Sequence, residues 1–153
     1  LASPSDTFPN DILKRYDTLL FTFIEKKASA YDKVLTDGLQ VELGKFIFLN
    51  ESSDFSNNVL HLSSKEVTLP LHVRSRRVGD RMSVKNLQGS KKIKDIFIDS
   101  KVSFELRDLW PIVTDDQDNI LWIPGIKKSN FDVSNKGLCD IIVKYEKGRN
   151  IDE

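Results

Sequence analysis

The sequence contains one cysteine, Cys139, and two histidines, His61 and His72. A single cysteine excludes an internal disulfide and is typical of a reducing compartment, so we expect a cytoplasmic location. One thiol and two imidazoles cannot form the clusters that bind zinc in structural sites. We therefore expect no metal site, and we expect structural roles for all three residues.

Long apolar runs are also missing, because no stretch approaches the roughly 18 residues that a membrane-spanning helix needs. We expect no membrane association. Glycine is sparse, with seven residues in all, and none has the spacing of a phosphate-binding loop. No signal peptide is visible, but the chain begins at Leu1 and not at Met, so we expect it to be a fragment of a longer protein.

Charge is balanced over the whole chain but not along it. The sequence has 23 Lys and Arg residues and 23 Asp and Glu residues, yet residues 71–107 hold ten basic and four acidic side chains. The segments before and after this one each carry an excess of acids, which cancels the difference. A cationic segment on a neutral protein indicates an anionic partner.

Short apolar runs, alternating or bounded by turn residues, predict a mostly antiparallel β protein. The expected strands lie at residues 39–49 (two strands, or one with a bulge at Gly44), 59–62, 109–113, 120–123 and 140–145. Residues 12–24 fit either a strand or a helix, and we favour a strand. The fold class is therefore α+β, with antiparallel sheets and one or two short helices.

Residues 67–73 also alternate, so Val67, Leu69, Leu71 and Val73 should face the core. Pro70 has no N–H group to donate, which favours an edge strand or a strand start. An exposed edge can pair with another chain. This gives an alternative function, a protein-interaction or self-association module with a homodimer as the simplest partner.

Two pairs of residues predict structural turns, Gly79-Asp80 and Pro124-Gly125. Ser90 is the expected N-cap of a helix over residues 91–98, with Ile93, Ile96 and Phe97 buried. Lysines in the first turn of this helix would interact unfavourably with the helix dipole, and each would cost at most about 0.3–1 kcal/mol of stability. That placement favours a role for these lysines in binding a ligand.

Four ordered runs carry a family resemblance: VRSRRVGDRM, GSKKIKDIFIDSKV, RDLWPIV and ILWIPGIKKS. Together they resemble the C-terminal domain of bacterial tRNA(Ile)-lysidine synthetase, over about residues 69–143. The resemblance implies a C-terminal tRNA-binding domain at residues 64–153, preceded by a small β-rich region at residues 1–63. It also implies a fold similar to a domain of the phenylalanyl-tRNA synthetase β subunit.

In that family a separate N-terminal domain uses ATP and L-lysine to convert the wobble cytidine of tRNA(Ile) with a CAU anticodon to lysidine. The resemblance thus implies three things: this chain is non-catalytic, ATP and Mg²⁺ belong to the catalytic domain, and the partners are that domain and the tRNA. The C-terminal domain is expected to grip the tRNA body near the acceptor stem. The implied RNA-contact residues are Arg74, Arg76, Arg77, Arg81, Lys91, Lys92, Lys94 and Arg107.

Each of these residues also has a structural interpretation. The arginines could form salt bridges to Asp80 or Asp108, and Arg107 with Asp108 could be a structural ion pair. Asp80 is expected to stabilise its turn or orient an arginine, and a hydrolase with Asp80 and Asp95 as acid and base is the remaining alternative. Trp110 and Trp122 are expected to pack in the core rather than stack on bases. Lys127 and Lys128 could extend the cationic surface or have no part in it.

Overall fold

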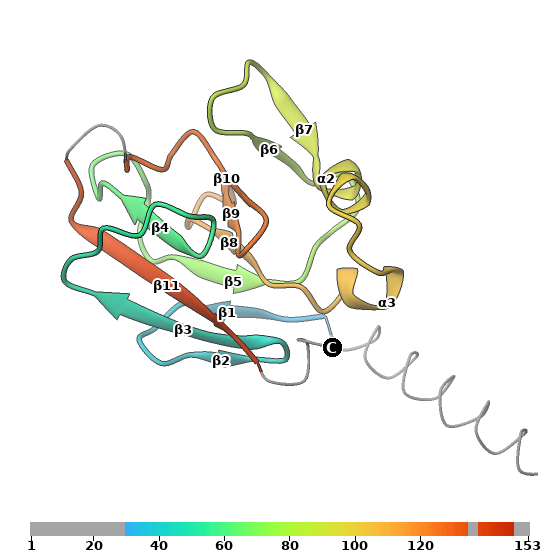
Figure 1. Cartoon of the computed structure of the whole chain (residues 1–153), viewed down its shortest axis with the longest axis horizontal. Coiled ribbons are helices and arrows are strands. Elements are labelled where there is room, and N and C mark those ends of the chain that lie inside the picture. The colour runs from blue at the N-terminus through green and yellow to red at the C-terminus, as the bar shows by residue number, and fades with distance from the viewer. Residues whose placement is uncertain (1–29, 135–137, 149–153) are drawn as a thin grey trace, which may run out of the picture. The chain divides into compact units, whose positions relative to one another are not determined.

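The computed structural model describes residues 30–134 and 138–148 (Figure 1). The chain divides into two compact units, Leu1–Ala30 and Tyr31–Glu153, and the fold described below is that of the second. The strand predicted over residues 12–24 lies outside the described residues. No helix in the described part of the chain is long and apolar enough to cross a bilayer.

The first sheet is antiparallel and has five strands in the order β1-β5-β8-β9-β10. These strands are β1 (Asp32–Val34), β5 (His72–Arg74), β8 (Ile112–Thr114), β9 (Ile120–Ile123) and β10 (Lys127–Lys128). The β8–β9 hairpin confirms the prediction for residues 109–123. Neither β1 nor β10 was predicted.

The second sheet is also antiparallel and has four strands in the order β2-β3-β11-β4. They are β2 (Gln40–Val41), β3 (Gly44–Leu49), β11 (Ile141–Lys147) and β4 (Val59–Leu62). One apolar cluster draws on both sheets, with Phe46, Leu60, Val73, Trp122 and Val143 fully buried. Trp122 therefore packs in the core, as the sequence predicts, and its ring meets Phe46 edge-on at 5.9 Å.

A two-stranded hairpin and two short helices complete the described fold (Figure 1). They are β6 (Arg81–Ser83), β7 (Ser90–Lys92), α2 (Ile93–Asp99) and α3 (Phe104–Arg107). A second apolar cluster joins them to the five-stranded sheet, with Met82, Ile93, Phe97, Ile112 and Ile123 buried in it. Mostly antiparallel sheets with two short helices confirm the predicted fold class.

The prediction of an edge strand at residues 67–73 is wrong. Strand formation is confined to His72–Arg74, and β5 pairs with β1 on one side and β8 on the other. Leu69 is 51% exposed instead of facing the core. A strand bonded on both sides offers no free edge, so self-association through this segment has no structural basis.

The predicted start of the helix is also wrong. Ser90, Lys91 and Lys92 form β7, and α2 begins at Ile93 without a side-chain cap. The buried residues Ile93, Ile96 and Phe97 are as predicted. Because two of the three lysines precede the helix, the dipole argument for a ligand applies only to Lys94.

The predicted boundary near Ser63-Ser64 does not coincide with the division between compact units. Strand β4 ends at Leu62, and it pairs with β11 at the far end of the chain. Contacts divide the chain at Ala30 and Tyr31 instead. Residues 31–62 therefore belong to the same compact unit as the residues after them.

Replacing Gly44 by alanine should destabilise the fold, because β3 and β11 approach closely there. A Cβ atom on Gly44 would lie 2.3 Å from the Glu146 carbonyl oxygen and 2.7 Å from the Tyr145 ring. Overpacking of this kind costs about 1–3 kcal/mol of unfolding free energy. Urea unfolding would measure it, with Lys45→Ala, an exposed neighbour, as the control. Equal midpoints for the two variants would contradict the expectation.

Candidate nucleic-acid interface

Arg74 is a buried ion-pair residue and must be removed from the predicted RNA contacts. Its side chain is 1% exposed. The guanidinium donates to both carboxylate oxygens of Asp80 at 2.9 and 3.0 Å, and its Nε donates to Asp118 at 3.0 Å. Burial alone would lower the pKa of Arg74, but these hydrogen bonds outweigh burial and raise it. A guanidinium enclosed in this way cannot reach an RNA phosphate.

Arg76 and Arg77 are also paired with acids, although less completely. Arg76 is 19% exposed and donates to Asp108 at 2.9 Å, while its guanidinium lies over the Phe97 ring. Arg77 is exposed and lies 3.1 Å from Asp32 and 3.6 Å from Asp118. Arg74 and Arg77 therefore share Asp118 as a partner.

Arg107 does not form the ion pair predicted with Asp108. Its Nε donates to the Val102 carbonyl at 2.9 Å, and its guanidinium lies over the Phe104 ring. Asp108 accepts from Arg76 instead. Lys91 is likewise engaged, because its ammonium donates to the Asp99 carboxylate.

The turn residues occupy turns with the geometry they were expected to adopt. Gly79 and Gly125 have φ angles of 86° and 76°, in the region that glycine adopts readily. Asp80 accepts from the Arg77 backbone N–H at 2.7 Å, in addition to Arg74. Its carboxylate is thus the turn stabiliser and arginine partner that we predicted. Both carboxylate oxygens of Asp80 accept these hydrogen bonds, so Asp80 is not available as an acid catalyst.

Arg81, Lys92 and Lys94, which we call the hairpin cations, are exposed. Arg81 donates to the Ser90 hydroxyl at 2.9 Å and to the Ser90 carbonyl at 3.1 Å. Lys92 and Lys94 make no side-chain hydrogen bond or ion pair with any residue that the structure describes. Arg81 and Lys92 are direct cross-strand partners between β6 and β7, so the two cations share one face of the hairpin.

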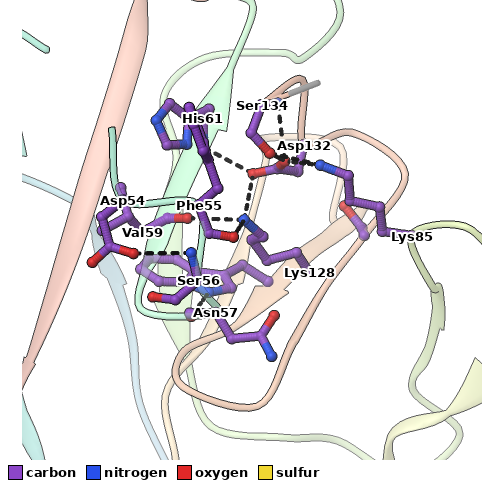
Figure 2. A network of polar contacts seen from close by, with 12 residues as sticks. Asp54, Phe55, Ser56, Asn57, Val59, His61, Lys85, Lys128, Asp132 and Ser134 are labelled. Carbon is purple, nitrogen blue, oxygen red and sulfur yellow. Dashed lines mark hydrogen bonds and ion pairs between the residues drawn. The ribbon is translucent and has the colours of Figure 1, made fainter. Parts of the chain in front are cut away.

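A buried polar network joins Lys85, which lies between β6 and β7, to residues near β4 and β10, and the sequence did not predict it (Figure 2). The Asp132 side chain is 0% exposed and accepts from Lys85, Ser134 and the His61 backbone N–H. Lys128 is 5% exposed, donates to the Phe55 and Val59 carbonyls, and lies 3.5 Å from Asp132. Alternation in β10 is the only sequence signal that could have separated buried Lys128 from exposed Lys127.

Comparison with known proteins gives one consistent result. A model of the TilS substrate C-terminal domain matches residues 71–141. The chain is 40% identical over 158 residues to tRNA(Ile)-lysidine synthase of Bacillus licheniformis, covering 94% of this chain and 33% of that relative. It is 42% identical over 159 residues to the bifunctional protein TilS/HprT of Listeria monocytogenes, covering 97% of this chain and 24% of that relative.

A solved structure agrees with these relatives. A crystal structure of a TilS C-terminal domain superposes with a TM-score of 0.69 at 37% identity, covering 78% of this chain and 98% of that one. The chain belongs to the TilS C-terminal domain family. It spans about a third or less of the full-length relatives named above.

The segment matched by the TilS C-terminal domain model contains all eight predicted RNA-contact residues. It runs from Leu71 to Ile141, and so also includes the carboxylate partners of Arg74 and Arg76 and the Lys85, Lys128, Asp132 and Ser134 part of the buried network. The predicted RNA-contact residues differ in their partners. Arg74, Arg76, Arg77 and Lys91 are paired with acids, and Arg107 is bonded to a backbone carbonyl. The hairpin cations have no acidic partner among the residues that the structure describes.

Proposed function

We propose that this chain is the tRNA-binding part of a tRNA(Ile)-lysidine synthase and binds tRNA(Ile) with a CAU anticodon through the hairpin cations. The chemistry belongs to a catalytic domain of the same protein, where ATP and Mg²⁺ act, and the reaction takes place in the cytoplasm. Membership of the TilS C-terminal domain family supports the choice of ligand. The exposed charges of the β6–β7 hairpin support the choice of surface.

The pairing of Arg81 with Lys92 is the observation that carries this proposal. Like charges placed directly opposite each other on neighbouring strands destabilise a sheet. A hairpin selected for stability alone would have an acid at one of these positions. Arg81 uses two of its five N–H donors on Ser90, which fixes its side chain and leaves donors for another group.

An RNA stem suits this arrangement. An A-form helix hides the base edges of its deep, narrow major groove and presents mainly phosphates and 2′-hydroxyls to a protein. Cations that project from a short hairpin can contact those phosphates without entering a groove. Lys94, which follows β7 on the first turn of α2, adds a third charge to the same part of the chain.

Replacing Lys92 by glutamate should weaken tRNA binding and stabilise the fold at the same time. The introduced carboxylate would face Arg81 across the strands, and such a pair of opposite charges contributes roughly 0.2–1 kcal/mol to stability. The loss of one phosphate contact should lower the slope of log K against log salt by about 0.7–0.9. A gel-shift salt series with tRNA(Ile) and a thermal melt would measure the two effects.

Lys45→Glu is the matched control for that experiment, because Lys45 is an exposed strand lysine paired with Glu146 within the four-stranded sheet, outside the β6–β7 hairpin. It should leave the salt slope for tRNA unchanged. If Lys92→Glu bound tRNA with the affinity and salt slope of the unsubstituted chain, the hairpin cations would not be the interface. A raised melting temperature with unchanged tRNA binding would show only that a pair of opposite charges across from Arg81 stabilises the hairpin.

A further inference from the structure

A small cavity opens beside the Asp132 network, and its walls come from separate parts of the chain. Its volume is about 260 Å³. That is less than the roughly 300–1,000 Å³ of pockets for drug-sized ligands, so it suits a group as small as a phosphate. Its lining includes Phe55 and Asn57 before β4, Val84, Lys85 and Asn86 after β6, Lys127 and Lys128 of β10, and Ser134.

The lysines around this cavity outnumber the acids that neutralise them. Lys85 and Lys128 share the carboxylate of Asp132, as Figure 2 shows. Lys127 is exposed and makes no side-chain hydrogen bond or ion pair within residues 30–134 and 138–148. The exposed carboxylate of Asp54 adds negative charge near Lys128 but does not line the cavity. Three lysines thus line the cavity, with one buried carboxylate beside it and one exposed carboxylate near Lys128.

The pKa of Lys128 is consistent with this shortage of negative charge. Burial lowers the pKa of Lys128, Asp132 opposes the effect, and the charge of Lys85 adds to it. An anion in the cavity would interact favourably with both lysines. Because the site is partly buried, that interaction would be screened less than a contact on the open surface.

The hairpin cations lead toward this cavity along one side of β6. Met82 and Val84 are buried, so alternation places Arg81 and Lys85 together on the opposite side. Val84 is bridged to Ser129, and the Lys85 N–H donates to the Lys128 carbonyl at 3.0 Å. Lys85 begins the turn that follows β6 and Val84, and four steps along a strand span about 13 Å. A nucleic-acid strand on the hairpin could therefore continue into the cavity.

Phe55 gives the cavity an aromatic wall. Its side chain is 55% exposed although it is large and apolar. Its ring lies 5.1 Å from the buried His61 ring, at 42° to it, which supports Phe55 from beneath. An exposed aromatic ring beside lysines is the combination by which proteins bind single-stranded nucleic acids, with bases stacked on the ring.

We propose that this cavity, the Phe55 pocket, binds the phosphate group of an unpaired RNA nucleotide whose base stacks on Phe55. Lys85 and Lys127 supply the charge that meets the phosphate, and Lys128 holds the Phe55 backbone in place from below. The inference rests on the proposed function, since the RNA would reach the pocket along the hairpin cations. It adds recognition of an unpaired nucleotide to contact with a stem.

Fluorescence anisotropy on the full 153-residue chain tests this, with a labelled chain of five uridines and an abasic chain of equal length as probes. Phe55→Ala should weaken uridine binding by about 5- to 100-fold and leave abasic binding within about twofold. Lys127→Ala should weaken both probes and lower the salt slope by about 0.7. Lys65→Ala, an exposed lysine between β4 and β5, is the control and should change neither.

The outcomes separate this inference from the proposed function. Unchanged binding in Phe55→Ala and Lys127→Ala would overturn the Phe55 pocket, while loss of tRNA binding in Lys92→Glu would still support the hairpin cations. Pocket variants that lose uridine binding while Lys92→Glu keeps tRNA binding would support the pocket alone. Polyglutamate that displaced the uridine probe as well as an equally charged RNA would identify an acidic peptide as the ligand and overturn the inference.

Discussion

Replacing Arg74 by methionine should destabilise the domain by about 3–5 kcal/mol, which is the cost of breaking a buried ion pair by removing one partner. Methionine fills a similar volume but leaves the Asp80 carboxylate, 12% exposed, without its guanidinium. Asp80 also accepts from the Arg77 N–H in the turn before β6, so the turn should loosen as well. Urea unfolding at neutral pH measures the loss.

Arg77→Met is the matched control, because Arg77 shares Asp118 with Arg74 but is 54% exposed. Exposed ion pairs contribute about 0–1 kcal/mol, so this variant should unfold almost as the unsubstituted chain does. Adding Asp80→Leu to Arg74→Met should recover part of the stability, since an apolar pair can replace a buried ion pair, although the bond from the Arg77 N–H is then lost. Equal losses for Arg74→Met and Arg77→Met would refute the buried role of Arg74.

Much of the sheet structure could be predicted from local patterns. Residues 59–62 and 120–123 are apolar runs bounded by turn residues, and both became strands. The strands that escaped prediction, such as β1 and β10, are two or three residues long and mostly polar, so they show no apolar alternation. β1 has a polar sequence and forms because it pairs with β5, some 40 residues later. Such strands depend on tertiary contacts, which a short sequence window does not contain.

The positive charge of the candidate interface could be predicted from the sequence, but the residues that form it could not. Counting charges along the sequence located the cationic segment at residues 71–107, and the hairpin cations lie within it. Counting could not show that Asp118, more than 40 residues from Arg74, neutralises that arginine. It also could not show that β7 replaces the first turn of the expected helix. The register of β6 on β7, which brings Arg81 opposite Lys92, comes from the structure alone.

Asp132→Asn should be the other strongly destabilising substitution, again by about 3–5 kcal/mol, because it leaves Lys85 and Lys128 without their shared carboxylate. Asparagine keeps the shape of the side chain, so the loss reports the charge and the hydrogen bonds rather than a cavity. Asp54→Asn is the control, since Asp54 is exposed and should change stability by no more than about 0.5 kcal/mol.

The pH dependence of unfolding tests the same carboxylate independently. Burial alone would raise the pKa of Asp132, but hydrogen bonds from His61, Lys85 and Ser134 outweigh it and lower the pKa from 3.8 to about 2. Because the pKa of Asp132 is lower in the folded state than in the unfolded state, its carboxylate stabilises the fold. This contribution is fully present above pH 3.8 and is lost as the pH falls toward 2. The difference corresponds to about 2 kcal/mol. The gap in unfolding free energy between the unsubstituted chain and Asp132→Asn should therefore narrow between pH 4 and pH 2, and a constant gap would show that Asp132 is not the group that titrates.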